Sequence, residues 1–211
     1  MSNQAKQIIF VVDDDADVRD SLKWLLESVD LNVTVFETAQ RFLDGCPENA
    51  QGCILMDVRM PGMSGLSAQN QLAERRIYMP LIMISGHADV DMAVSAMTQG
   101  ALTFLQKPFS DQALIDIVQQ ALLQDSARCH QAELISDVRV CYANLTKRER
   151  QVFEGVVAGL ANQEVADHLG INRKTVEGHR ANMMTKMRAG SLSELIQMSV
   201  ALGLVKSYGQ H

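Results

Sequence analysis

Residues 8–15 read IIFVVDDD, and this stretch decides the fold of the first half of the 211-residue chain. A short apolar run rich in β-branched residues is typical of a strand buried on both faces of a parallel sheet. Segments with helical apolar spacing alternate with such runs and predict an α/β domain of five strand–helix units with right-handed connections. The four further runs are Val33–Phe36, Cys53–Met56, Leu81–Ile84 and Leu102–Leu105.

Polar residues stand directly after four of the five predicted strands. The carboxyl ends of the strands form the ligand-binding edge of an open α/β sheet, beside the point where the strand order reverses. With the flavodoxin-like order 2-1-3-4-5, the first and third strands are neighbours there. We therefore expect Asp13, Asp14 and Asp57 to share one pocket. The polar residues at this edge are Asp13, Asp14, Asp15, Asp57, Ser85 and Lys107.

The residue types of this pocket indicate phosphoryl chemistry. Clustered carboxylates repel one another unless a cation or a proton intervenes. Their hard oxygens suit Mg²⁺, which takes one or two carboxylates together with water and a phosphate. An Asp carboxylate is a nucleophile for phosphoryl groups, and the ammonium of Lys107 would contact one phosphoryl oxygen. The pattern predicts a phosphorylatable aspartate assisted by Mg²⁺.

Two other interpretations of the acidic run have to be weighed. The spacing Asp13-x-Asp15-x-Asp17 matches the start of a calcium-binding EF-hand loop, but Val18 replaces the required Gly and Trp24 the required Glu. The run could also be a solvated turn in which Asp15 caps a helix. This second interpretation loses weight because polar residues also follow the third, fourth and fifth strands.

The motifs of this half resemble the receiver domain of two-component response regulators, over residues 6–123. Ser85 stands where the family more often has Thr, and Phe104 where it more often has Tyr. Four motifs occur in the family's order, namely Val12-Asp13-Asp14-Asp15, Asp57-x-x-Met60-Pro61-x-Met63-x-Gly65, Ser85-Gly86-His87 and Lys107-Pro108-Phe109.

The resemblance implies a phosphoacceptor and a metal site. Asp57 would accept a phosphoryl group from a phosphohistidine of a sensor histidine kinase. Asp14, Asp57 and the backbone carbonyl of Arg59 would bind Mg²⁺ directly, and Asp13 would act through water. The chain would not be an enzyme, and its only reaction beyond accepting the phosphoryl group would be the hydrolysis of that group.

The resemblance also implies how the phosphoryl group is sensed. Ser85 would hydrogen-bond to it, Lys107 would pair with it, and Phe104 would be the aromatic switch residue. Arg59 and His87 would tune hydrolysis by controlling access of water. The peptide bond between Lys107 and the proline that follows it is a candidate for the cis form.

The composition of the chain predicts a cytoplasmic protein without a membrane partner. Hydrophobic residues make up 47% of the chain and charged residues 21%, as in globular proteins. No apolar run is long enough to span a bilayer, and residues 1–7 lack the features of a secretory signal. Four cysteines show neither CxxC pairs nor Cys/His ligand spacing, so we expect reduced thiols and no structural zinc. They are Cys46, Cys53, Cys129 and Cys141.

Charge and helix signals divide the chain into three segments. Residues 1–123 hold 16 Asp/Glu and 8 Lys/Arg, whereas residues 144–211 hold 6 Asp/Glu and 9 Lys/Arg. This difference in charge indicates separate tasks for the acidic first part and the basic last part, and the alternative is that it arose by chance. Residues 124–143 contain no Gly or Pro and are expected to be a largely helical linker, not a flexible one. We therefore predict an α/β domain, a helical linker and an all-α domain with these bounds.

The last segment is predicted to contain four helices, over 147–158, 163–169, 173–187 and 192–202. Thr146-x-x-Glu149 and Ser191-x-x-Glu194 are capping-box patterns. Asn162 and Asn172 are suitable N-cap residues. Residues 161–187 read helix, short turn with Gly170, helix, which is the helix-turn-helix arrangement that places its second helix in the major groove of DNA.

The second of these helices has a polar side suited to DNA. Basic groups would reach phosphates, and a few other side chains would read base edges. The alternative is an ordinary amphipathic helix with a solvated polar face. The candidate DNA-binding residues are Arg173, Lys174, Thr175, Glu177, His179, Arg180, Asn182 and Lys186.

Residues 139–204 resemble the LuxR-type, or NarL/FixJ, DNA-binding domain. The residues that carry the resemblance are Leu145-Thr146-x-Arg148-Glu149-x-x-Val152, Gly159-Leu160-Ala161-Asn162-x-Glu164-Val165-Ala166 and Lys174-Thr175-Val176-Glu177-x-His179-Arg180-x-Asn182. With a receiver ahead of it, the chain resembles a response regulator of the FixJ subfamily. This implies that phosphorylation promotes a homodimer or frees the DNA-binding domain, which then binds promoter DNA and recruits RNA polymerase.

Two rival functions are weighed against this one. An Asp-nucleophile phosphohydrolase needs an Asp-x-Asp-x-Thr/Val signature, from which residues 13–17 depart at the fifth position. A phosphorylation-independent DNA-binding regulator would carry a degenerate receiver. The intact set of Asp14, Asp57, Ser85 and Lys107 argues against that interpretation.

Overall fold

The apolar runs of the first half form a five-stranded parallel sheet in the computed structural model, which describes residues 7–86 and 90–204. The strand order is β2-β1-β3-β4-β5, as predicted. Each strand lies within one residue of its expected bounds. The central strands β1, β3 and β4 are buried almost throughout, whereas the edge strands β2 and β5 are only partly buried. The strands are β1 Ile8–Val12, β2 Asn32–Phe36, β3 Gly52–Asp57, β4 Leu81–Ser85 and β5 Thr103–Gln106.

Five helices accompany the sheet, and side-chain caps begin four of them. The side chains of Asp15, Thr38, Ser64 and Ser110 each accept a hydrogen bond from a backbone N–H in the first turn of the helix that follows. The helices are α1 Ala16–Glu27, α2 Ala39–Gly45, α3 Gly65–Glu74, α4 Val90–Thr98 and α5 Asp111–Ala143.

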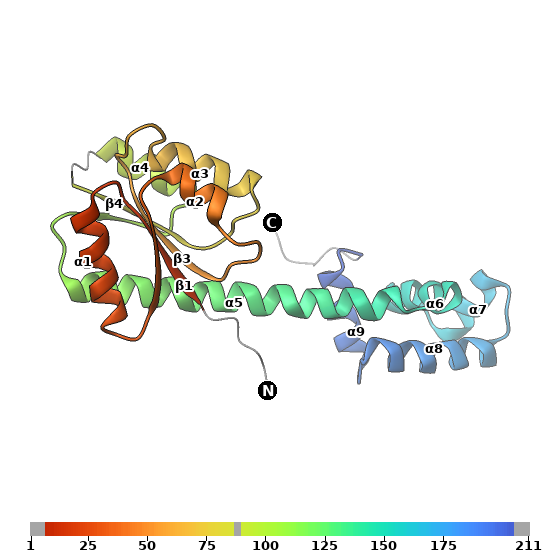
Figure 1. Cartoon of the computed structure of the whole chain (residues 1–211). Coiled ribbons are helices and arrows are strands. Elements are labelled where there is room, and N and C mark those ends of the chain that lie inside the picture. The colour runs from red at the N-terminus through yellow and green to blue at the C-terminus, as the bar shows by residue number, and fades with distance from the viewer. Residues whose placement is uncertain (1–6, 87–89, 205–211) are drawn as a thin grey trace. The chain divides into compact units, whose positions relative to one another are not determined.

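Alternate strand residues pack against two helix layers, one on each face of the sheet (Figure 1). Phe10, Ile54 and Met83 belong to the core under α2, α3 and α4. The opposite core contains the next residue of β1 and of β3, and it packs under α1 and α5. This period-2 alternation fixes the register of the strands, because a one-residue slip would exchange the two faces.

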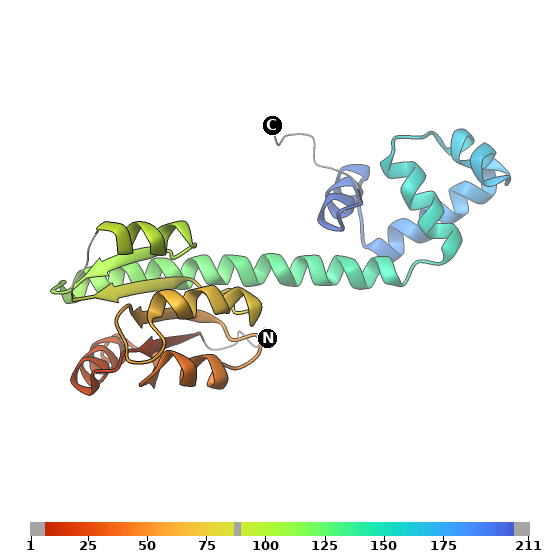
Figure 2. The same ribbon diagram turned by 90° about the horizontal axis from the view of Figure 1, so that it is seen from above.

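Helix α5 runs without a break through the segment expected to be a partly helical linker, as Figure 2 shows. Residues 124–143 all lie in α5, which agrees with the absence of Gly and Pro. Contacts divide the chain into two compact units, Met1–Cys129 and His130–His211, so the division falls inside this helix. The domain bounds at 123 and 143 stay predictions.

The C-terminal unit contains helices α6 Lys147–Val157, α7 Asn162–Leu169, α8 Arg173–Met187 and α9 Leu192–Ala201. Their apolar faces, including Val152, Phe153, Val165 and Val176, form one buried core. None of the helices in the described part of the chain is long and apolar enough to cross a membrane.

Two capping predictions in this unit need correction. Asn162 is the first residue of α7, and Ala161 occupies the N-cap position, where its backbone N–H donates to the Glu164 carboxylate. The capping box at Ser191 is half formed, because the Glu194 carboxylate accepts from Gly190 N and not from Ser191 N. The box at Thr146 and the N-cap at Asn172 are confirmed.

Candidate functional site

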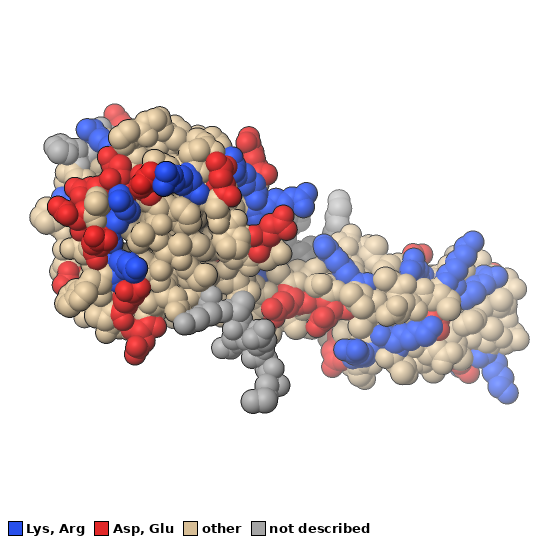
Figure 3. Space-filling model, viewed as in Figure 1, with Lys and Arg blue, Asp and Glu red and all other residues tan. Residues whose placement is uncertain are grey.

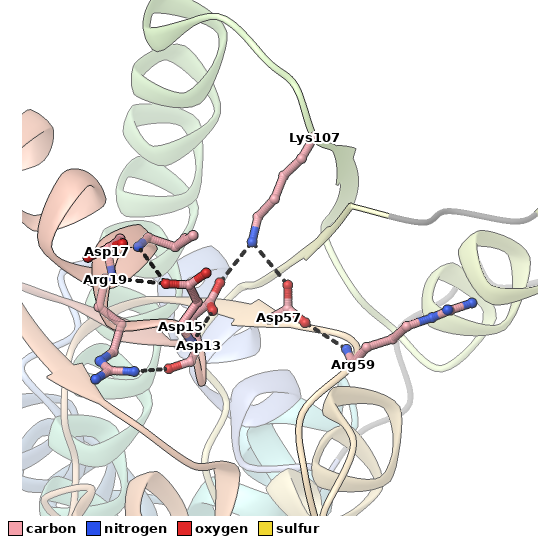
Figure 4. Close-up of polar contacts among 8 residues, drawn as sticks. Asp13, Asp15, Asp17, Arg19, Asp57, Arg59 and Lys107 are labelled. Carbon is pink, nitrogen blue, oxygen red and sulfur yellow. Dashed lines mark hydrogen bonds and ion pairs between the residues drawn. The ribbon is translucent and has the colours of Figure 1, made fainter.

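Three side chains that are distant in sequence meet at the carboxyl edge of the sheet (Figure 4). Asp13 follows β1, and Asp57 ends β3, which pairs with β1 so that Val12 lies opposite Met56. The ammonium of Lys107 lies between the two carboxylates, 2.9 Å from Asp13 Oδ2 and 3.1 Å from Asp57 Oδ1. The expected shared pocket therefore contains Asp13, Asp57 and Lys107.

The backbone after β5 directs Lys107 into this pocket. Lys107 N donates to Ser85 O at 2.8 Å, which extends the pairing of β4 and β5 by one residue. The Lys107–Pro108 peptide bond is cis, as expected from the sequence. Ser85 itself is buried at the end of β4, so the hydroxyl-bearing residue and the ammonium-bearing residue are joined through their backbones.

Asp57 is held on both oxygens and is only 8% exposed. Its Oδ2 accepts from the backbone N–H of Arg59 at 2.7 Å. Burial raises the pKa of the Asp57 carboxyl above its usual value, although the Arg59 N–H and the Lys107 ammonium act in the opposite direction. Perturbed pKa values with specific charge partners cluster at functional sites.

Lys107 keeps its positive charge in this setting. Burial alone would lower the pKa of its ammonium, but the hydrogen bond and charge of Asp13, followed by those of Asp57, outweigh this and raise it. The ammonium therefore stays protonated at neutral pH. It is a fixed positive group at the place where negative charge would gather on a transferring phosphoryl group.

Asp13 is anchored by its neighbours, and the run that it begins has divided roles. Its Oδ1 accepts from Asp15 N at 3.0 Å, and its backbone carbonyl accepts from Arg19 Nη1 at 2.7 Å. Asp15 caps α1, so the capping interpretation is right for this one residue. Asp14 is exposed to solvent. Sequence reasoning missed Arg19, because an Arg one turn into a helix has no distinctive pattern.

Glycine at position 65 brings α3 against the backbone of Asp57. Gly65 N donates to Val58 O at 3.0 Å. A Cβ at Gly65 would lie 2.3 Å from the Asp57 carbonyl oxygen, a distance that no side chain tolerates. Gly65 ends the second receiver motif, and this close approach gives its place there a steric reason.

The donor set at this edge fits Mg²⁺. Within residues 7–86 and 90–204, no group of three or more His, Cys, Asp or Glu side chains is placed to hold a metal ion by itself. Mg²⁺ does not need such a cage, because it keeps several waters and binds through one or two carboxylates and a phosphate. The carboxylates of Asp14 and Asp57 and the carbonyl of Arg59 offer oxygen alone, which suits Mg²⁺ better than zinc or copper.

The remaining receiver residues singled out by sequence fall in two places. Phe104 lies on β5 opposite Met83 and packs, half-buried, against the core under α2, α3 and α4. His87 lies outside the described residues.

The helix-turn-helix predicted from the sequence is present as α7, the turn 170–172 and α8. Gly170 adopts the left-handed conformation that ends α7, with φ +65°. Lys and Arg side chains predominate over acidic ones on the visible face of helices α6 to α9 (Figure 3). Six of the predicted DNA-binding residues are exposed on α8, and His179 and Arg180 are half-buried. The exposed six are Arg173, Lys174, Thr175, Glu177, Asn182 and Lys186.

Polar contacts within the unit engage several of these side chains. Arg173 Nε donates to Glu177 Oε1 at 2.9 Å, and Arg180 Nη1 donates to Asn162 Oδ1 at 2.8 Å. The Arg173–Glu177 pair is exposed, whereas the Arg180–Asn162 pair is partly buried.

Lys186, which the sequence placed among the DNA-binding residues, forms an ion pair with another helix of the unit. Its ammonium donates to Glu149 Oε2 of α6 at 2.7 Å, and the Glu149 side chain is buried. The hydrogen bond from Lys186, followed by that from Thr146 N, lowers the pKa of the Glu149 carboxyl. Lys186 therefore joins α8 to α6. Helical spacing alone assigned it to the polar side, because the partner on α6 is visible only in the folded unit.

Comparison with known proteins matches both halves of the chain. Residues 9–119 match the response regulator receiver domain, and residues 143–199 match the luxR family of bacterial regulatory proteins. The chain is 47% identical over 196 residues to the transcriptional regulatory protein FixJ of Azorhizobium caulinodans, covering 93% of each. It is 42% identical over 197 residues to FixJ of Bradyrhizobium diazoefficiens, covering 93% of this chain and 96% of that protein.

A solved structure supports the same relationship. The low-resolution structure of the response regulator StyR is 40% identical in sequence and superposes with a TM-score of 0.83, covering 93% of this chain and 99% of that one. The chain belongs to the FixJ/NarL-type response regulators, transcription regulators that join a receiver domain to a LuxR-type DNA-binding domain.

Proposed function

We propose that the chain accepts a phosphoryl group on Asp57 from a sensor histidine kinase and, once phosphorylated, binds promoter DNA through α8 to activate transcription. The observation that carries the proposal is the Lys107 ammonium, held between the buried carboxylates of Asp57 and Asp13. A structural ion pair would need one carboxylate. Two carboxylates sharing one ammonium leave negative charge that a second cation would neutralise.

The residues of the pocket have complementary roles in phosphoryl transfer. A carboxylate oxygen of Asp57 attacks phosphorus, the bond to the histidine nitrogen of the kinase breaks, and that imidazole leaves with a proton. Lys107 stabilises the negative charge on the phosphoryl oxygens, and the Arg59 N–H fixes the orientation of Asp57. Asp14, Asp57 and the Arg59 carbonyl would hold Mg²⁺, with Asp13 acting through water, and the bound metal would supply charge neutralisation.

Phosphorylation would act by shifting a balance between two conformations. The added charge and acceptor oxygens stabilise the state in which Ser85 and Lys107 contact the phosphoryl group. Phe104 is the aromatic residue on β5, the strand that leads directly to Lys107. We propose that its rearrangement changes the face formed by α4, β5 and α5, which then forms a homodimer or frees the DNA-binding unit.

The exposed polar side of α8 would contact promoter DNA. Arg173, Lys174 and Arg180 would neutralise phosphates, and Thr175, Glu177, His179 and Asn182 are the candidates for base contacts. RNA polymerase is the expected partner at the promoter. Loss of the phosphoryl group by hydrolysis would reset the chain, and replacing Arg59 with Ala should change its half-life if this side chain controls access of water.

The phosphoacceptor assignment is tested by Asp57→Asn, with Asp20→Asn as a matched control on the exposed side of α1. A small phosphodonor and Mg²⁺ are supplied to each purified chain, and binding to promoter fragments selected from the host genome is measured. We expect phosphodonor-stimulated binding in the wild type and in Asp20→Asn, and none in Asp57→Asn. Stimulated binding by Asp57→Asn would show that another residue is the acceptor.

A further inference from the structure

A buried carboxylate lies at the opposite end of the receiver sheet from the phosphorylation pocket. Leu114, Val118 and Ala121 form the stripe of α5 that packs on the sheet, and Asp125 continues that stripe one turn further. Asp125 is 0% exposed, although it is the one charged member of the stripe. It also lies beyond residue 119, where the match to the receiver family ends.

Asp125 is satisfied on both oxygens. Its Oδ2 accepts from Gly52 N at 2.7 Å, across 73 positions of sequence. Its Oδ1 accepts from Arg128 Nε at 3.0 Å and Nη2 at 2.7 Å. A buried charge persists only with such partners, and a polar contact of this kind can fix the register of an element more strictly than apolar packing does.

The residue that Asp125 contacts is the first residue of β3, and the last residue of β3 is Asp57. Gly52 has φ +139°, and a Cβ there would lie 1.8 Å from the carbonyl oxygen of Ile8 on β1. Only glycine fits this close approach of the two strands. The Asp125 carboxylate thus binds the Gly52 N–H, at a point where β3 is packed tightly against the backbone of β1.

The surroundings of Cys53, the next residue of β3, support the same picture. Burial, followed by the charge of Asp125, raises the pKa of this thiol to about 12. Gln7, just before β1, donates from Nε2 to the backbone carbonyl of Leu122 at 2.8 Å. Helix α5 is therefore held to the starting ends of β1 and β3 immediately before it continues toward α6.

We propose that Asp125 is a positioning residue that couples Asp57 phosphorylation to DNA binding, by tying α5 to the strand that carries the phosphoacceptor. The proposal rests on the proposed function, since it needs a phosphorylation-dependent change in DNA affinity. With Asp125 in place, α5 leaves the receiver at a position fixed by β3. Without the Asp125 carboxylate, the turns of α5 around residue 125 separate from the sheet. The DNA affinity of the C-terminal unit then no longer depends on whether Asp57 is phosphorylated.

The test measures the ratio of DNA affinities of the phosphorylated and unphosphorylated chain, on one promoter fragment selected with the phosphorylated wild type. Asp125→Leu replaces the carboxylate with an apolar side chain of the same branched shape. Asp125→Asn keeps an oxygen that accepts from Gly52 N but removes the charge that pairs with Arg128. Asp137→Leu and Asp137→Asn, at an exposed position of α5, are the matched controls.

We expect Asp125→Leu to take up phosphate at Asp57 at the wild-type rate and to reduce the coupling by about fivefold or more, so that its two affinities converge. Asp125→Asn should recover part of the ratio, and the Asp137 variants should keep all of it. The Gly52 amide resonance reports directly whether the Gly52 N–H is hydrogen-bonded to residue 125. A wild-type ratio in a variant whose Gly52 resonance shows that this hydrogen bond is absent would overturn the proposal.

Two further outcomes are also decisive. If Asp125→Leu fails to fold, Asp125→Asn decides together with its Gly52 amide resonance. A full wild-type ratio with that hydrogen bond absent would overturn the proposal, and a reduced ratio would support it. If the wild type itself shows equal affinities with and without phosphate on Asp57, the proposed function fails, and this is known before any Asp125 variant is compared.

Discussion

Lys107 Nζ lies 3.1 Å from Asp57 Oδ1, although 50 positions of sequence separate the two residues. The same ammonium contacts Asp13 at 2.9 Å. This arrangement joins the ends of β1 and β3 to the residue that follows β5, so one cation holds together three loops of the pocket.

Removing this cation should slow phosphorylation. We expect Lys107→Met to take up a phosphoryl group from a small phosphodonor about tenfold or more slowly, because it lacks the group that stabilises charge on the phosphoryl oxygens. The pKa of Asp57 should also rise further, since Lys107 acts to lower it. Uptake is followed by intact mass, and Lys23→Met on the surface of α1 is the control. Equal rates in the two variants would exclude the proposed role of Lys107.

The Glu149–Lys186 pair should make stability depend on pH in the acid range. The pKa of folded Glu149 is lowered from its ordinary value of 4.5, so the stabilisation is complete above that value and is lost as pH falls through the folded pKa. We expect Glu149→Gln to lower the free energy of unfolding by about 1–2 kcal/mol at neutral pH. Its loss of stability on acidification should be smaller than that of the wild type.

Denaturant unfolding at several pH values measures this difference. Glu154→Gln is the matched control, because Glu154 lies on the same helix and is exposed. If Glu149→Gln and Glu154→Gln have the same stability at every pH, the Glu149–Lys186 pair contributes nothing to stability.

Cys53 should be inert in the folded protein. Burial, followed by the charge of Asp125, raises the pKa of its thiol to about 12, and the thiolate is the form that reacts with alkylating reagents. We expect iodoacetamide at mildly alkaline pH to leave Cys53 unmodified in native protein and to modify it after denaturation. Peptide mapping by mass spectrometry reads both states. Labelling of Cys53 at equal rates in both would mean that the thiol is not enclosed as described.

Lys174 should contribute to DNA affinity without reading sequence. It is exposed near the beginning of α8, where a side chain would reach a phosphate. We expect Lys174→Ala to weaken binding about equally on specific and unrelated DNA, and to reduce the slope of log affinity against log salt by about 1. Lys147→Ala on α6 removes the same charge elsewhere. Identical slopes in the two variants would mean that α8 has no special place at the DNA.

The sheet and the pocket were predictable because each depends on local pattern. Runs such as Ile8–Val12 are buried on both faces, so almost every residue is apolar and the strand is distinct from its neighbours. Once the strand order is assumed, residues that follow neighbouring strands must meet, which places Asp13 beside Asp57. The order itself also proved right.

The interactions that the sequence did not predict depend on a partner from a distant element. Lys186 has the spacing of a surface residue, and only the folded unit shows that Glu149 lies within 2.7 Å. Asp125 stands in a weakly patterned stretch of sequence, and its partner Gly52 is 73 positions away. Arg19 contacts the carbonyl of Asp13, a backbone group that leaves no trace in the sequence.

The central claim is tested most directly by locating the phosphoryl group. The purified chain is incubated with a small phosphodonor with and without Mg²⁺, and the modified residue is mapped by mass spectrometry. The account predicts Mg²⁺-dependent uptake of one phosphoryl group, on Asp57. Uptake on another residue, or none in the presence of the metal, would contradict it.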